Sequence, residues 1–271
     1  MRTRATTMWV AATVGLGVCL AGAPVTAQTT PESEDALKCQ TGQSKTTAKF
    51  VGAKSKCAQK CLTTARKTMG PYTDCMPPYA GDAATCIHDS SKGAEAKALA
   101  GIGKGCAKGC PSCYADDTPS NCPNGAGFVA TAENNVDAVS PLVYCLEAHG
   151  NTPTKDQAKC EDGVAKSLGK FFDSFGKCIS SCVTDEFNGK SPSGSCTAGS
   201  PSDAKTQKCL SKAVTKTSES IDKVCLETPG NPPCYSAGLD SGAEWTGLVR
   251  GILASASPAT FCGSPSGAFL N

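Results

Sequence analysis

The cysteines of this chain follow a spacing that occurs twice. The pattern C-x17-C-x3-C-x13-C begins at Cys39 and recurs 121 positions later, beginning at Cys160. The cysteines that carry it are Cys39, Cys57, Cys61 and Cys75 in the first copy and Cys160, Cys178, Cys182 and Cys196 in the second. Residues between the cysteines match as well: Lys38/Lys159, Gly42/Gly163, Lys45/Lys166, Lys49/Lys170, Phe50/Phe171 and Lys56/Lys177. The sequence therefore predicts an internal duplication, with repeats of an ordinary domain size at 36–150 and 151–271.

The first 27 residues are typical of a secretory signal peptide. Arg2 and Arg4 precede an apolar stretch over 8–25, and Val25 and Ala27 supply the small residues that a signal peptidase requires. A membrane anchor is the weaker alternative, because Gly and Pro interrupt a run that is shorter than about 20 residues. We expect a secreted or periplasmic protein with no transmembrane span after cleavage.

The cysteine count favours a disulfide framework. Of 19 cysteines, Cys19 leaves with the signal, and the remaining even number is expected of an exported protein without free thiols. The expected disulfide cysteines are Cys39, Cys57, Cys61, Cys75, Cys86, Cys106, Cys110, Cys113, Cys122, Cys145, Cys160, Cys178, Cys182, Cys196, Cys209, Cys225, Cys234 and Cys262. No metal or cofactor is predicted, since only His88 and His149 are available to a Cys/His zinc site and no CxxCH haem motif occurs.

Proline-free stretches and recurring helix formers predict an all-α fold. After a flexible lead-in at 28–35, long helices are expected over 36–68 and 154–187, and second helices over 83–110 and 203–227. A third segment matches at a shift of 117, where Phe128 corresponds to Trp245 and Ser140-Pro141 to Ser257-Pro258. The expected architecture is two tandem disulfide-stapled modules, each a long antiparallel helical hairpin plus a third helix.

Helix geometry restricts the bridges. Cys39 and Cys57 lie about 27 Å apart along one helix and cannot pair, whereas an antiparallel hairpin brings the cysteines of its two helices together. The expected hairpin pairs are Cys39–Cys106, Cys57–Cys86, Cys61–Cys75, Cys160–Cys225, Cys178–Cys209 and Cys182–Cys196. If the chain folds back at the two Ser-Pro sequences, the other pairs are Cys122–Cys145, Cys234–Cys262 and, by elimination, Cys110–Cys113.

Six lysines of the first long helix form the main candidate binding site. Their steps of 7, 4, 7, 4 and 7 residues place Lys38, Lys45, Lys49, Lys56, Lys60 and Lys67 on one narrow face. Such a face suits an anionic surface polymer or an acidic protein partner. The alternative is a solvated helix face whose lysine stems cover apolar surface. The matching helix favours that alternative, because Asp156, Glu161, Asp162 and Asp173 stand among its lysines.

A second candidate is the sequence Cys110-Pro111-Ser112-Cys113, which has the spacing of thiol oxidoreductases. Cys110 is expected at the end of a helix, where the helix dipole disfavours a thiolate. A structural role is therefore the preferred interpretation. No motif of a serine hydrolase, zinc protease or nucleotide-binding loop is present, and we predict no enzymatic activity.

The pattern KC-x2-G-x2-K-x3-KF-x5-KC-x3-C resembles the secreted cysteine-rich helical repeats of bacterial proteins. The resemblance covers the long helix of each repeat and implies export and a helical fold, but no activity. The chain has 26 Lys and Arg against 24 Asp and Glu, and the charges balance once Arg2 and Arg4 are removed. A nucleic-acid partner is therefore not expected. The leading hypothesis is a non-enzymatic exported structural or interaction protein, followed by an anion-binding protein and then by a thiol oxidoreductase.

Overall fold

The computed structural model describes residues 27–28, 33–114, 125–145, 153–192, 194–196, 201–226, 230–262 and 269–270. Within these residues the protein is all-helical apart from a two-residue antiparallel pairing of β1 (Ala27–Gln28) with β2 (Phe269–Leu270). Most of the predicted signal peptide and part of the predicted lead-in lie outside the described residues. No helix of the described part has the length and apolar character that crossing a membrane requires.

Two long helices form the centre of the molecule. Helix α1 spans Glu34–Thr68 and α5 spans Lys155–Phe187. Ser33 caps α1 by accepting a hydrogen bond from the backbone of Ala36, and Thr154 caps α5 in a reciprocal capping box with Gln157. These caps satisfy backbone N–H groups that have no partner inside the helix. The expected long helices are therefore confirmed, with α1 beginning two residues earlier than predicted.

Each long helix pairs with a shorter antiparallel partner. Helix α6 (Ala204–Cys225) packs on α5, while α2 (Gly81–His88) and α3 (Ala94–Cys106) pack on α1. The prediction of a single helix over 83–110 is wrong, because the helix is interrupted between α2 and α3. The Asp89 carboxylate causes the break by accepting hydrogen bonds from the backbone N–H groups of Ser91 and Lys92.

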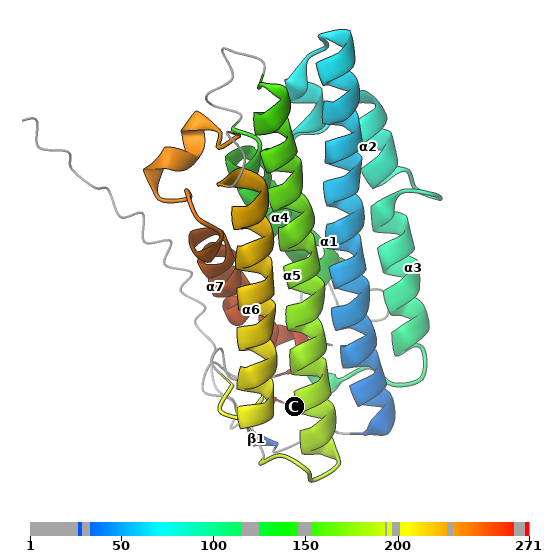
Figure 1. Cartoon of the computed structure of the whole chain (residues 1–271). Helices are drawn as coiled ribbons and strands as arrows, with labels where there is room; N and C mark the ends of the chain where they lie inside the picture. Colours follow the sequence, from blue (N-terminus) through cyan, green and yellow to red (C-terminus); the bar gives the residue numbers. More distant parts are fainter. Residues whose placement is uncertain are drawn as a thin grey trace, which may run out of the picture.

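The helices form two layers (Figure 1). One layer contains α2 and α3, then α1, α5 and α6 side by side, and α4 (Ala126–Val143) and α7 (Gly242–Thr260) lie behind it. Helices α1 and α5 run antiparallel. Arg66 of α1 contacts Asp162 near the start of α5, whereas Ser44 approaches Gly176 near its end. The two repeats thus pack along most of the length of their long helices.

All six predicted hairpin bridges are present. They are Cys39–Cys106, Cys57–Cys86, Cys61–Cys75, Cys160–Cys225, Cys178–Cys209 and Cys182–Cys196. Matching bridges have similar sequence separations: 14 residues for both Cys61–Cys75 and Cys182–Cys196, and values that differ by two residues for the other two matching pairs. The spacing therefore predicted the hairpin bridges correctly.

The other predicted bridges are wrong. Each predicted pair would close a single repeat, whereas the observed bridges join the two repeats. Cys113 pairs with Cys262, and Cys145 pairs with Cys234. Helices α4 and α7 continue through their Ser-Pro sequences, so the fold-back on which the in-repeat pairs depended does not occur. Cys110 is also disulfide-bonded, and Cys122 lies outside the described residues.

A reciprocal contact accompanies these two bridges. Tyr114, next to Cys113, donates a hydrogen bond to the carbonyl of Thr260 in the second repeat. Tyr235, next to Cys234, donates one to the carbonyl of Val143 in the first repeat. Each tyrosine also packs edge-on against an aromatic ring, Phe128 for Tyr114 and Trp245 for Tyr235. The end of each third helix is therefore held by the other repeat, and the two repeats form one covalently closed body.

Candidate functional site

A groove runs between α1 and α5 on the side away from α4 and α7. It has a volume of about 420 Å³, and lysines stand on both walls. Lys38 and Lys45 line it from α1, and Lys177 lines it from α5 together with one acidic residue, Asp173. The sequence had predicted only a stripe on the first helix. The structure brings that stripe next to the lysines of the matching helix.

Both lysine stripes are exposed to solvent. We define the lysine face as the exposed lysines of the two long helices. It comprises Lys38, Lys45, Lys49, Lys56, Lys60 and Lys67 of α1 and Lys155, Lys159, Lys166, Lys170 and Lys177 of α5. Because each stripe keeps to one side of its helix, a groove with Lys45 on one wall and Lys177 on the other places both stripes on the same side of the molecule.

The acidic residues of α5 offset this face less than the sequence suggested. Glu161 is buried, and both Glu161 and Asp162 bind the guanidinium of Arg66 at 2.7 and 3.2 Å. Asp173 does offset one lysine of the face, because it pairs with Lys177 at 2.5 Å. Lys38 is likewise paired, with Glu34 and Asp35 of its own helix. The ion pairs among the described residues leave several lysines of the face without a carboxylate partner. Among them are Lys45, Lys49, Lys56, Lys166 and Lys170.

The pKa of the buried Glu161 is strongly raised. Desolvation is the largest cause and raises its pKa to about 7, while the charge and hydrogen bond of Arg66 act in the opposite direction. One carboxylate oxygen of Glu161 has no hydrogen-bond partner within the described part of the chain. Gln40 is the residue at the matching position of the first repeat and is equally buried. The fold therefore accepts a neutral amide at this point.

This shift predicts a pH-dependent stability. Because the pKa of Glu161 is higher in the folded state than the ordinary glutamate value of 4.5, the folded protein binds more protons than the unfolded chain between pH 4.5 and about 7. The resulting stabilisation is complete below pH 4.5 and is lost as the pH rises through about 7. We expect the free energy of unfolding to fall by about 3 kcal/mol over this range from Glu161 alone.

Chemical unfolding of the wild type and of Glu161→Gln across this pH range tests the prediction. The variant should lose most of the slope, and Glu186, whose pKa burial also raises, should supply a smaller dependence of the same sign. A slope that is unchanged in Glu161→Gln would contradict the assignment.

A second polar cluster surrounds Lys54, on the opposite side of α1. The Lys54 side chain is fully buried, and its ammonium lies 2.6 Å from Glu133 and 2.7 Å from Asp137 of α4. It also lies 4.8 Å from the centre of the Tyr79 ring, and the Tyr79 hydroxyl donates a hydrogen bond to Asp137. Sequence reasoning missed this cluster. The available signal was that Lys54 departs from the lysine stripe and matches Phe175 of the second repeat.

The cluster continues to the surface through His88. Its Nδ1 lies 3.1 Å from a carboxylate oxygen of Glu95, and its Nε2 lies 3.7 Å from Glu133. His88 and Glu95 are about two-fifths and one-third exposed, and Glu133 is largely covered. These three groups come from α2, α3 and α4, which meet only after the chain has folded.

The Cys110–Cys113 motif does not form a dithiol pair. Cys113 lies in the short 3-10 helix η2 (Ser112–Tyr114) and is bonded to Cys262. Its sulfur is therefore used to join the repeats, and the geometry that a CxxC redox centre requires is not present.

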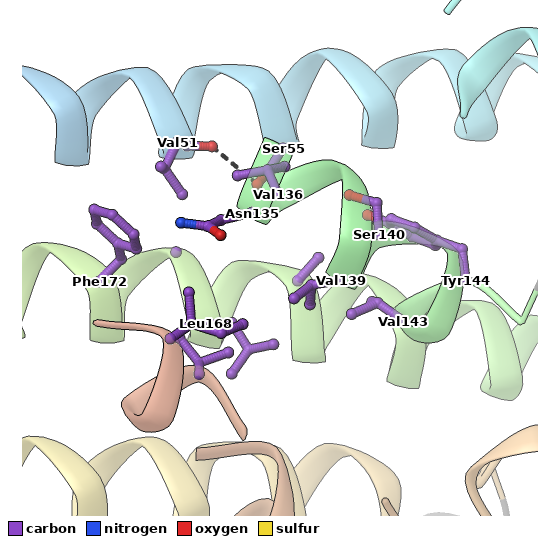
Figure 2. A pocket seen from close by; sticks show the side chains of 14 residues that line it. Val51, Ser55, Asn135, Val136, Val139, Ser140, Val143, Tyr144, Leu168 and Phe172 are labelled. Atoms are coloured by element: carbon purple, nitrogen blue, oxygen red, sulfur yellow. Dashed lines mark hydrogen bonds between the residues drawn. The ribbon is translucent and has the colours of Figure 1, made fainter. Parts of the chain in front are cut away.

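An apolar cavity lies where the two layers meet (Figure 2). Residues of α1, α4, α5 and α7 surround it, among them Val51, Val139, Leu168 and Phe172. Ser55 faces it but donates its hydroxyl to the carbonyl of Val51. The cavity volume is about 60 Å³, whereas small-molecule sites usually measure about 300–1,000 Å³. A metabolite does not fit in this cavity, and the lysine face and the Lys54 cluster are the stronger candidates.

Comparison with known proteins finds no match to a family model, to a curated protein or to a solved structure.

Proposed function

We propose that the protein is an exported, non-enzymatic interaction protein that binds an extended anionic polymer along the lysine face. The observation that carries this proposal is the groove between α1 and α5 with lysines on both walls. A signal-like first segment and eight described bridges fit an oxidising compartment outside the cytoplasm.

Length and charge favour a polymer over a compact anion. Helix α1 contains 35 residues, so its stripe extends over several tens of Å. The lysines that form no ion pair occur on both long helices, where a chain of phosphate, sulfate or carboxylate groups can contact them in series. A compact anion would contact only a few of them.

The rigid framework supports binding without large rearrangement. Two bridges and two tyrosine contacts hold the repeats together, so the spacing between the stripes is fixed before the ligand arrives. Preorganisation of this kind lowers the conformational cost of binding.

Fluorescently labelled heparin provides a probe for the mature protein. We expect binding to weaken by at least about tenfold between about 50 and 200 mM salt, because counterion release dominates such contacts. The quadruple variant Lys45→Gln, Lys49→Gln, Lys166→Gln and Lys170→Gln should weaken binding by at least about tenfold, since each lysine near an anionic surface contributes about 1 kcal/mol.

A charge-matched variant on α6 provides the control. It replaces four exposed lysines outside the lysine face: Lys208→Gln, Lys212→Gln, Lys216→Gln and Lys223→Gln. It should retain most of the affinity at equal net charge. Equal losses of heparin affinity in the two variants would contradict the proposal, because they would show nonspecific attraction. Salt-insensitive binding, or no heparin binding, would contradict it as well.

A further inference from the structure

We propose that His88 and Glu133, with Glu95 behind the imidazole, form a binding site for a divalent transition metal of the zinc class. The ligand atoms of these three residues lie within 4.8 Å of one another. The site is separate from the lysine face and does not depend on the function proposed for that face.

The two sides of the imidazole are arranged differently. Nδ1 lies 3.1 Å from Glu95, which is a hydrogen-bond distance, so Nδ1–H donates to this carboxylate and the lone pair resides on Nε2. Nε2 then faces Glu133 at 3.7 Å, too far for a good hydrogen bond. Two ligands about 2.1 Å from a tetrahedral zinc ion are about 3.4 Å apart, so the separation suits a shared metal.

The surrounding residues fix these ligands in place. A carboxylate that accepts a hydrogen bond from the second nitrogen of a metal-binding histidine orients the ring and increases its basicity. Glu95 has this position. Lys54 fixes Glu133 from the other side at 2.6 Å, and the carboxylate oxygen retains a second lone pair for a metal.

The charge of the cluster also favours a cation. Three carboxylates, those of Glu95, Glu133 and Asp137, share one ammonium, that of Lys54. With a neutral His88 the cluster carries two uncompensated negative charges, which one divalent cation balances. An imidazole ligand selects zinc, nickel or copper over calcium and magnesium, which prefer oxygen ligands.

The second repeat shows that the fold does not need this cluster. Alignment on the nearest matching cysteine or aromatic residue gives the following pairs: Lys54/Phe175, His88/Ser211, Glu95/Val214, Glu133/Arg250 and Asp137/Ala254. Phe175 is buried in a hydrophobic core to which both repeats contribute. A polar cluster that only one repeat carries, where the other packs without it, fits a role beyond stability.

Isothermal titration of the mature protein with ZnCl2, in buffer pretreated with chelator, tests the site. We expect one saturable equivalent of zinc and at least about tenfold weaker binding in His88→Ala. Calcium, which has the same charge, should not compete. His149→Ala is the matched control, because the chain contains two histidines, and it should bind zinc as the wild type does.

Thermal unfolding in the presence of chelator accompanies each titration. His88 is partly exposed, so His88→Ala should melt close to the wild type, which makes its loss of zinc binding interpretable. Glu133→Gln, which keeps the shape of the side chain, provides a second variant and should also weaken zinc binding by at least about tenfold. Absence of saturable zinc binding, equal binding in His88→Ala, loss in His149→Ala alone, or calcium competing as well as zinc would each overturn the proposal.

Discussion

Trp245→Ala is expected to lower the free energy of unfolding by about 3–5 kcal/mol, because removal of a large buried aromatic side chain leaves a cavity. Trp245 is completely buried and packs edge-on against Tyr235, with ring centres 5.0 Å apart. Tyr235 in turn donates a hydrogen bond to the first repeat and follows Cys234. Chemical unfolding with the disulfides intact, followed by circular dichroism, measures the loss.

Two controls accompany this variant. Trp245→Phe introduces the residue type found at the matching position of the first repeat, Phe128. It should lower the free energy of unfolding clearly less than Trp245→Ala does. Leu142→Ala removes a large apolar side chain that is 47% exposed on α4 and should cost less than about 1 kcal/mol. A loss below about 1 kcal/mol for Trp245→Ala would show that Trp245 is not packed at the centre of the second repeat.

Lys54→Met should be almost as damaging, with an expected loss of about 2–4 kcal/mol. The substitution keeps the length and burial of the side chain but removes the ammonium that lies between Glu133 and Asp137. Two like charges are then left close together beneath the surface. Because both carboxylates retain some contact with solvent, we expect the loss to fall short of that for a fully buried pair.

The triple variant Lys54→Met, Glu133→Gln and Asp137→Asn separates charge from packing. It removes the two unpaired charges and should recover most of the stability, because neutral replacement of a complete buried ion cluster is often tolerated. Urea midpoints of the single and triple variants provide the comparison. A triple variant as unstable as the single one would show that packing of the lysine stem, not its charge, is what matters.

The hairpins could be predicted because they depend on local rules. A helix rises by a fixed amount per residue, and a bridge requires close Cα atoms. Matching intervals such as Cys39–Cys57 and Cys160–Cys178 therefore leave few ways to pair with a second helix. The lysine stripe was predictable for the same reason, since its position depends only on the helical period.

The bridges that join the two repeats could not be predicted in this way. Whether Cys145 pairs with Cys122 or with Cys234 depends on where α4 ends, and Pro141 within that helix falsely indicated a fold-back. The groove depends on the packing of α1 against α5, and the His88 site on the meeting of α2, α3 and α4. Neither arrangement leaves a periodic signal in the sequence.

Disulfide mapping of the non-reduced mature protein tests most directly whether the repeats form one body with a shared lysine face. Proteolysis followed by mass spectrometry should recover peptides that join Cys113 to Cys262 and Cys145 to Cys234. Both crosslinks connect the two repeats. Recovery instead of Cys122–Cys145 and Cys234–Cys262 would mean two separately closed modules, and the two lysine stripes would not be held on one face.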